Sequence, residues 1–211
     1  GPNSYNRSFP LPETVGDSDK TVTWTISDLP AGEYTVSESS ADVKDYTYTV
    51  TYNNGTANSD TVTVEKNKTN TMTVTNTYTE NATVNLSQLI QKQLTLKDGS
   101  TLPAGTKFTV TVTPKTVNNQ PATSTQPISG TVRDLGTGTT NGDGDTIYTA
   151  SFDFTGGTLS LSAGTYTYTV QEDATSPISG MQYDSKEYTL TIAVENSVAT
   201  VKYTTGEGST A

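Results

Sequence analysis

Two stretches of this chain repeat one pattern, an alternation of apolar and polar residues that ends in a glutamate. Residues 32–38 read GEYTVSE and residues 164–172 read GTYTYTVQE, so Glu38 and Glu172 take the same place in each. Side chains that alternate in this way point to opposite faces of a β-strand, of which one is buried. Similar short runs recur along the chain with turn signals between them, and no segment keeps a helical period over three turns. The sequence therefore predicts an all-β protein.

The expected strands form two groups that meet near residue 80. Those of the first group are 21–26, 34–38, 46–52, 61–65 and 71–78, and those of the second are 86–96, 107–113, 147–154, 158–161, 166–172, 187–194 and 199–203. We therefore expect two domains, residues 1–80 and residues 81–211. The stretch 114–145 is polar and rich in Pro, Thr, Asn and Gly, which predicts a loop with at most one short strand.

Two local expectations follow from the same alternation. Trp24 alternates with Val22 and Ile26, so we expect it in the core rather than on an exposed carbohydrate-binding platform. The run that begins at Leu86 has room for one turn of helix, but it leads into a candidate core lysine. We therefore expect it to be a strand from its first residue.

Composition excludes several classes of function. The chain has no Cys and no His, which removes disulfides, thiol nucleophiles, imidazole bases and the usual zinc ligand sets. Its net charge of −10 argues against nucleic acids and anionic membranes as partners. No apolar run approaches the roughly 18 residues of a membrane span. We expect no membrane insertion, no cofactor and no metal, and a hydrolytic enzyme is poorly supported.

One loop resembles a calcium-binding segment. Asn141, Asp143 and Asp145 supply oxygen atoms at alternate positions, as calcium loops do. Thr146 stands where the next glycine is expected, however, and Phe152 stands where the closing glutamate is expected. We interpret the segment as a hairpin loop.

Lys92 is a further charged residue of interest, besides the two repeated glutamates. Alternation places Ile90, Lys92 and Leu94 on one face, which points the lysine toward the core. A lysine, a glutamate and an asparagine on neighbouring core strands are what a protein needs to form an amide bond between its own side chains. The plain structural alternatives are an edge lysine that opposes aggregation and a glutamate that faces solvent at the end of its strand.

These motifs resemble those of two related Gram-positive families. Residues 21–79, with DLPAG, YTVSE and the closing VTNTY, look like the latter part of a collagen-adhesin B-type (CnaB-like) domain. Residues 86–205, with FTVTVTP, GTYTYTVQE and MQYDSKEYTLTIAVEN, look like the streptococcal pilin isopeptide-linkage domain. Both families are immunoglobulin-like β-sandwiches in pilins and sortase-anchored adhesins. The resemblance implies two tandem sandwiches of this type on an extracellular, cell-wall-anchored bacterial surface.

The resemblance also implies roles for particular residues. In these families a first-strand lysine bonds to a last-strand asparagine with the help of a glutamate. By position, Glu38 and Asn76 match in the first half, and Lys92 and Glu172 match in the second. If loop lengths are similar, residues 1–80 lack the lysine strand and residues 81–211 lack the asparagine strand. Residues 3–11 or a neighbouring molecule are candidates to fill the first gap.

The expected function is therefore mechanical. We expect a stalk fragment of a pilin or adhesin whose partners are neighbouring domains or subunits and whose only chemistry is self-directed amide formation. The alternative is an adhesive binding module in which loops such as 114–145 hold a glycan or a host protein.

Overall fold

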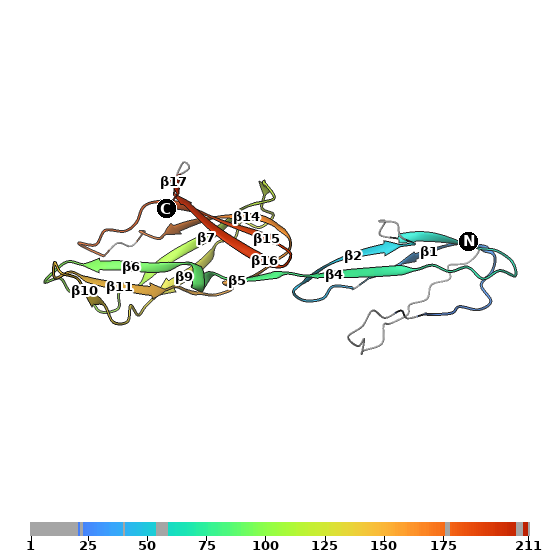
Figure 1. Cartoon of the computed structure of the whole chain (residues 1–211), viewed down its shortest axis with the longest axis horizontal. Helices are drawn as coiled ribbons and strands as arrows, with labels where there is room; N and C mark the ends of the chain where they lie inside the picture. Colours follow the sequence, from blue (N-terminus) through green and yellow to red (C-terminus); the bar gives the residue numbers. More distant parts are fainter. Residues whose placement is uncertain are drawn as a thin grey trace. The chain divides into compact units, whose positions relative to one another are not determined.

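The computed structural model describes residues 21, 23–39, 41–53, 59–175, 178–205 and 209–210 (Figure 1). The fold is all-β, with 53% strand and 2% helix, and its curled antiparallel sheets are those of immunoglobulin-like β-sandwiches. The predicted fold class is therefore confirmed. The chain divides into two compact units, and each is described here by itself.

The first unit is built on strands that pair two by two. They are β1 (Gly32–Ser37), β2 (Tyr46–Tyr52), β3 (Ser59–Val64) and β4 (Val74–Glu80). β1 pairs with β3 in antiparallel register, and β2 pairs with β4. Tyr52 is the large buried residue of this unit, at 1% exposure, and its hydroxyl accepts a hydrogen bond from the backbone N–H of Glu38. This contact ties the end of β1 to β2.

The second unit contains the remaining elements. They are β5 (Ala82–Asn85), α1 (Leu86–Leu89), β6 (Gln91–Leu96), β7 (Phe108–Val117), β8 (Gln120–Pro121), β9 (Ile128–Val132), β10 (Thr139–Thr140), β11 (Thr146–Ser151), β12 (Asp153–Phe154), β13 (Thr158–Leu161), β14 (Gly164–Glu172), β15 (Glu187–Glu195), β16 (Val198–Thr205) and β17 (Ser209–Thr210). The largest sheet has the order β12-β9-β7-β14-β15-β16-β17, with β8 beside β7. The smaller sheets are β10-β11-β6 and β13-β5.

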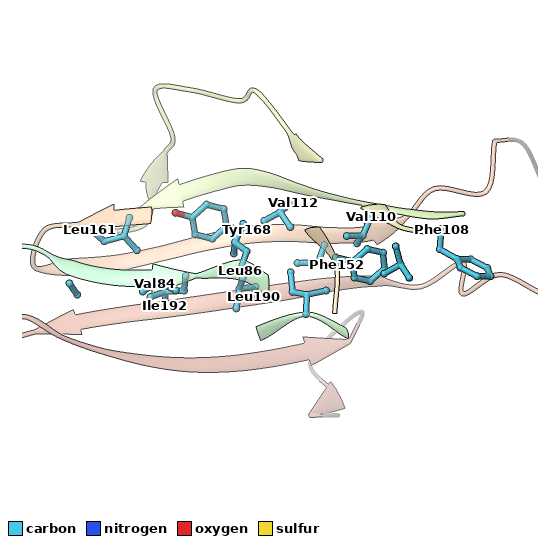
Figure 2. Packing of buried hydrophobic residues seen from close by; sticks show 14 of the residues in the cluster. Val84, Leu86, Phe108, Val110, Val112, Phe152, Leu161, Tyr168, Leu190 and Ile192 are labelled. Carbon is cyan, nitrogen blue, oxygen red and sulfur yellow. The ribbon is translucent and has the colours of Figure 1, made fainter. Parts of the chain in front are cut away.

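The core of the second unit lies between the large sheet and the smaller ones (Figure 2). Its fully buried side chains come from β7, α1 and β15, among them Phe108, Val112, Leu86, Leu190 and Ile192. The strands that carry them alternate buried and more exposed positions, so each strand offers one apolar face to this layer. The buried apolar residues of the second unit thus form one continuous core.

The expected strand over residues 86–96 is wrong at its beginning. Leu86–Leu89 forms the single-turn helix α1, and the strand β6 starts at Gln91. Asn85 caps the helix, because its side-chain oxygen accepts a hydrogen bond from the N–H of Ser87 at 3.0 Å. None of the four helical residues is β-branched, which removes one local preference for a strand. The turn places Leu86 in the core at 0% exposure.

The expected loop over residues 114–145 is also wrong. This stretch contains the end of β7 and the strands β8, β9 and β10. Asn118 and Asn119, with φ of 51° and 62°, make the tight turn from β7 to β8. β9 then pairs with the first half of β7. A polar composition hid these strands because each is short and lies near a sheet edge.

The expected core position of Trp24 is wrong as well. Trp24 is 45% exposed, and residues 23–26 are not assigned to a strand. An alternating sequence forms a strand only where a neighbouring strand supplies backbone hydrogen bonds. The described strand pairs of this unit are β1–β3 and β2–β4, and neither includes residues 23–26. Val22 lies outside the described residues.

A core substitution tests the layer that holds the second unit together. Leu190→Ala should lower the free energy of unfolding by about 2–5 kcal/mol, because it removes buried apolar contacts and leaves a cavity. Val198→Ala, at a position that is 63% exposed on the adjacent strand, should change it by less than about 0.5 kcal/mol. Urea unfolding followed by circular dichroism measures both, and equal effects of the two substitutions would contradict this packing.

Candidate functional site

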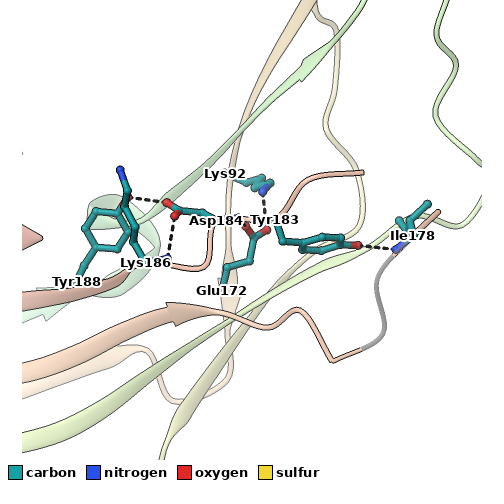
Figure 3. Close-up of polar contacts among 7 residues, drawn as sticks. All are labelled: Lys92, Glu172, Ile178, Tyr183, Asp184, Lys186 and Tyr188. Atoms are coloured by element: carbon teal, nitrogen blue, oxygen red, sulfur yellow. Dashed lines mark hydrogen bonds and ion pairs between the residues drawn. The ribbon is translucent and has the colours of Figure 1, made fainter. Parts of the chain in front are cut away.

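Lys92 and Glu172 meet across the two layers of the second unit (Figure 3). Lys92 lies on β6 of a smaller sheet, and Glu172 is the last residue of β14 in the large sheet. The lysine Nζ donates to Oε1 of Glu172 at 2.5 Å, and the two side chains are only 10% and 9% exposed. A charged pair this well buried is costly to desolvate unless its geometry is good, so the contact is a defined feature of the core.

The alternation of β6 explains why the lysine points inward. Ile90, Lys92 and Leu94 are buried, whereas Gln91 and Gln93 between them are exposed. The other partner is placed by the sheet, because Glu172 lies opposite Val110 in the β14–β7 register. The structure thus brings together two residues that the sequence had singled out separately.

Two aromatic rings surround the lysine amine. Nζ lies 4.5 Å from the centre of the Phe108 ring and 5.9 Å from that of Tyr183. The rings are 6.0 Å apart, and the Tyr183 hydroxyl accepts a hydrogen bond from the backbone of Ile178. Aromatic faces attract a cation and also keep water away from it. They restrict the positions that the amine can take.

A second acidic residue, Asp184, contacts Glu172. Its backbone N–H donates to Oε2 of Glu172 at 3.0 Å. Its carboxylate accepts one hydrogen bond from the N–H of Lys186 at 3.0 Å and another from the hydroxyl of Tyr188 at 2.5 Å. Asp184 lies within the motif MQYDSKEYTLTIAVEN, but the sequence alone assigned it no role. Nothing in the spacing of Asp184 shows that its backbone reaches Glu172.

The contacts of Asp184 shift two pKa values in opposite directions. Partial burial acts to raise the pKa of the Asp184 carboxyl, but the hydrogen bonds from Tyr188 and Lys186 and the charges of Lys186 and Lys92 hold that pKa below its usual value. The hydrogen bond to Asp184, together with burial, raises the pKa of Tyr188. Asp184 is therefore ionised at neutral pH, and Tyr188 keeps its proton.

The site opens into a cavity of ≈ 570 Å³ beside β6. Lys92 and Glu172 line it together with Asp184, Tyr188 and Tyr203. On one side β6 pairs with β11, and in the described part of the chain no strand pairs with its other edge. That edge therefore offers backbone donors and acceptors next to the cavity.

The first unit holds a second pair of the residues that the sequence singled out. Nδ2 of Asn76 donates to Oε1 of Glu38 at 2.9 Å. The other oxygens of these groups, Oε2 of Glu38 and Oδ1 of Asn76, are buried and have no hydrogen-bond partner among the described residues. A buried acceptor without a donor is costly, so this pair has the chemistry to receive an N–H donor such as an amine.

Neither pair contains all three groups within the described residues. The Lys92–Glu172 contact includes no asparagine carboxamide, and the Glu38–Asn76 contact includes no amine. Among the described residues before residue 81, the lysines with ion-pair partners are Lys44 and Lys68, which contact Asp45 and Glu65 instead. Residues 3–11, considered above as a source of the missing strand, lie outside the described residues.

The loop that resembles a calcium site has other contacts. Asp145 is buried, and its carboxylate accepts hydrogen bonds from Nζ of Lys97 at 2.6 Å and from the N–H of Asp98 at 3.2 Å. The side chain of Asn141 accepts hydrogen bonds from the N–H groups of Asp143 and Asp145. The hydrogen bond from Lys97 is the main cause that lowers the pKa of Asp145, and burial opposes it. These contacts tie a hairpin loop to the end of β6.

The described residues contain no group of three acidic, Cys or His side chains arranged to hold a metal ion. None of their helices has the length and apolar character needed to cross a membrane.

Comparison with known families identifies the second unit. Residues 89–210, more than half of the chain, match the FctA family, described as a Spy0128-like isopeptide containing domain. The chain belongs to the FctA family. Residues 5–79 match a domain of unknown function, DUF5979. No curated protein and no solved structure matched the chain.

Membership of the FctA family establishes the general setting of this protein. FctA domains are pilin domains that act at the cell surface, and their role is structural rather than enzymatic. Membership also implies association with other pilin subunits. The resemblance noted for residues 86–205 is thereby confirmed at the level of the pilin domain.

A double-mutant cycle tests whether Lys92 and Glu172 stabilise the unit as a pair. Lys92→Met or Glu172→Gln alone should each cost about 3 kcal/mol or more of unfolding free energy, because either leaves a buried group without its partner. The double substitution should cost clearly less than the sum of the two. Lys202→Met, at an exposed lysine on β16 of the same unit, is the matched control and should cost less than about 0.5 kcal/mol. Additive effects in chemical denaturation would contradict the pairing.

Proposed function

We propose that this chain is a stalk segment of a Gram-positive pilin or adhesin that is stabilised by amide bonds between its own side chains. Lys92 is the nucleophile of the second unit and Glu172 its proton-transfer group. Glu38 and Asn76 are the proton-transfer group and the acceptor of the first. The observation that carries the proposal is the buried Lys92–Glu172 contact within a domain of an isopeptide-containing family.

The proposed reaction joins a lysine amine to an asparagine carboxamide. The neutral amine attacks the carboxamide carbon, the C–N bond to the leaving nitrogen breaks, and one ammonia departs. A proton must move from the amine to that nitrogen, and a carboxyl group in contact with both is suited to transfer it. Glu172, at 2.5 Å from Nζ, is already in reach of the proton. Holding the groups in a rigid core supplies much of the rate, because little motion remains to be lost.

The free edge of β6 is where we propose that the acceptor strand of the second unit lies. A strand added there gains backbone hydrogen bonds along β6 and directs alternate side chains toward the cavity beside Lys92. An asparagine on such a strand would place its carboxamide near the amine. The cavity volume of ≈ 570 Å³ is ample for an asparagine side chain and its neighbours.

We propose that the first unit is a CnaB-like domain that awaits a lysine strand. The support is the contact between Glu38 and Asn76 and the two buried oxygens that lack a donor among the described residues. A lysine ammonium carries three N–H donors and no acceptor, so one group placed between these oxygens satisfies both. Residues 3–11 contain no lysine, so the strand that brings this group comes from a neighbouring molecule or from another segment of the protein.

The purpose of such bonds is mechanical. By analogy with a disulfide that closes a loop of about 100 residues, one bond between first and last strands contributes on the order of 4–5 kcal/mol through the unfolded state. It also carries tension through a covalent link rather than through strand hydrogen bonds. We propose that residues 1–80 and 81–211 act in this way as tandem domains, with the parent protein anchored to the cell wall.

Intact-mass measurement on the 211-residue chain tests the placement of the reacting groups. The mass should equal that of the sequence, because neither unit brings a lysine, a glutamate and an asparagine together among its described residues. A deficit of one ammonia per unit would contradict this and would show that a lysine or an acceptor has been misassigned.

Labelling at the cell surface separates the stalk from the adhesive alternative. Gold-labelled antibodies against this chain should mark fibres along their length on the producing cells. The segment 114–145, considered above as a gripping loop, holds strands instead. Labelling confined to fibre tips, together with binding to a glycan or a matrix protein, would favour the adhesive module.

A further inference from the structure

We propose that Asp184 is a positioning residue of the Lys92–Glu172 site, which orients Glu172 through its backbone and places a second negative charge near the lysine amine through its carboxylate. This inference rests on the proposed function, because it names a further residue for the same reaction. It concerns the segment between β14 and β15, to which the amide chemistry itself assigns no residue.

Asp184 orients Glu172 through its backbone N–H. Its two oxygens have different partners, since Oε1 accepts from Nζ of Lys92 and Oε2 accepts from the N–H of Asp184. The carboxylate is therefore held at both ends, in a plane set by one side chain and one backbone group. A proton-transfer group has to keep one oxygen toward the amine, and the N–H of Asp184 prevents the carboxylate from turning away.

The Asp184 side chain holds this N–H in position. The Asp184 carboxylate is fixed by the Tyr188 hydroxyl at 2.5 Å and by the Lys186 N–H at 3.0 Å (Figure 3). Tyr188 belongs to β15, a central strand of the large sheet, so the segment is fastened to a rigid element. The side chain of Asp184 thereby holds its own backbone against Glu172.

The Asp184 carboxylate also acts on Lys92 through its charge. Asp184 lies at the exposed mouth of the cavity and is ionised at neutral pH, and its charge interacts favourably with that of Lys92. The ionisable groups that line the cavity from the surrounding elements are Lys92 of β6, Glu172 of β14, Asp184 itself, Tyr188 of β15 and Tyr203 of β16. The charge of Lys186, in the same segment, also acts on Asp184. The Asp184 carboxylate attracts the Lys92 amine in its ammonium form, which cannot attack.

Asp184 thus has two opposing effects on the reaction. It holds the proton-transfer group in place, and its charge attracts the amine in the form that cannot attack. Asp184→Asn separates them, because the carboxamide oxygen can still accept from the Lys186 N–H and its NH2 group can donate to the Tyr188 oxygen, while the charge is lost. Asp184→Ala removes both.

Trace labelling with acetic anhydride, read by peptide mass spectrometry, measures the reactivity of the Lys92 amine against the other lysines of the same chain. At neutral pH and low salt, Asp184→Asn should label Lys92 about twofold to fivefold faster than the unaltered chain. The difference should shrink in high salt, because exposed charges are screened. Glu187→Gln removes an exposed neighbouring carboxylate on β15 and should leave the rate unchanged.

Amide hydrogen exchange at residue 184 measures the positioning effect. Protection of this N–H should persist in Asp184→Asn and fall in Asp184→Ala, since only the alanine lacks side-chain hydrogen bonds to Lys186 and Tyr188. Equal labelling of Lys92 in the unaltered chain and in Asp184→Asn, or full protection in Asp184→Ala, would overturn the proposal. Neither measurement needs the amide bond to form, so failure of the proposed function would show separately, as an absence of cross-linked Lys92.

Discussion

The contact between Lys92 and Glu172 depends on the two layers of the sandwich being held in one relative position. β6 supplies the amine from a small sheet, and β14 supplies the carboxylate from the large one, so a shift of either sheet by one residue would separate them. The core around Leu86, Leu190 and Ile192 fixes that position. The site is therefore a consequence of the packing, and its burial in turn gives the contact its strength.

The surroundings of the amine combine features that act against one another. The rings of Phe108 and Tyr183 exclude water and stabilise a cation, whereas the proposed reaction needs a neutral amine. The same aromatic wall that holds the amine in place thus attracts it as a cation, which is not the form that attacks. A resting ion pair that becomes reactive only when an acceptor strand closes the cavity would avoid side reactions before the fold is complete.

The sequence predicted the main residues of the site better than the contacts among them. Alternation placed Lys92 on the buried face of its strand, and the repeated motif drew attention to Glu172, because both signals are local. Asp184 could not be found in this way, since its contact with Glu172 runs through a backbone N–H and depends on how the segment after β14 folds back. The same reason explains the errors in the fold. Capping by Asn85, the turn at Asn118 and the exposure of Trp24 depend on tertiary partners that a pattern of polarity does not reveal.

The most direct test of the proposed function is peptide mapping of the assembled protein recovered from the surface of the producing cells. Lys92 should be found in a branched peptide, joined to an asparagine-derived side chain with the loss of one ammonia, while Lys97 nearby should be recovered in linear peptides. Lys92→Arg, which leaves no primary amine, should abolish the branch. Recovery of Lys92 in full yield as an unmodified linear peptide would contradict the proposal that this pair forms a covalent bond.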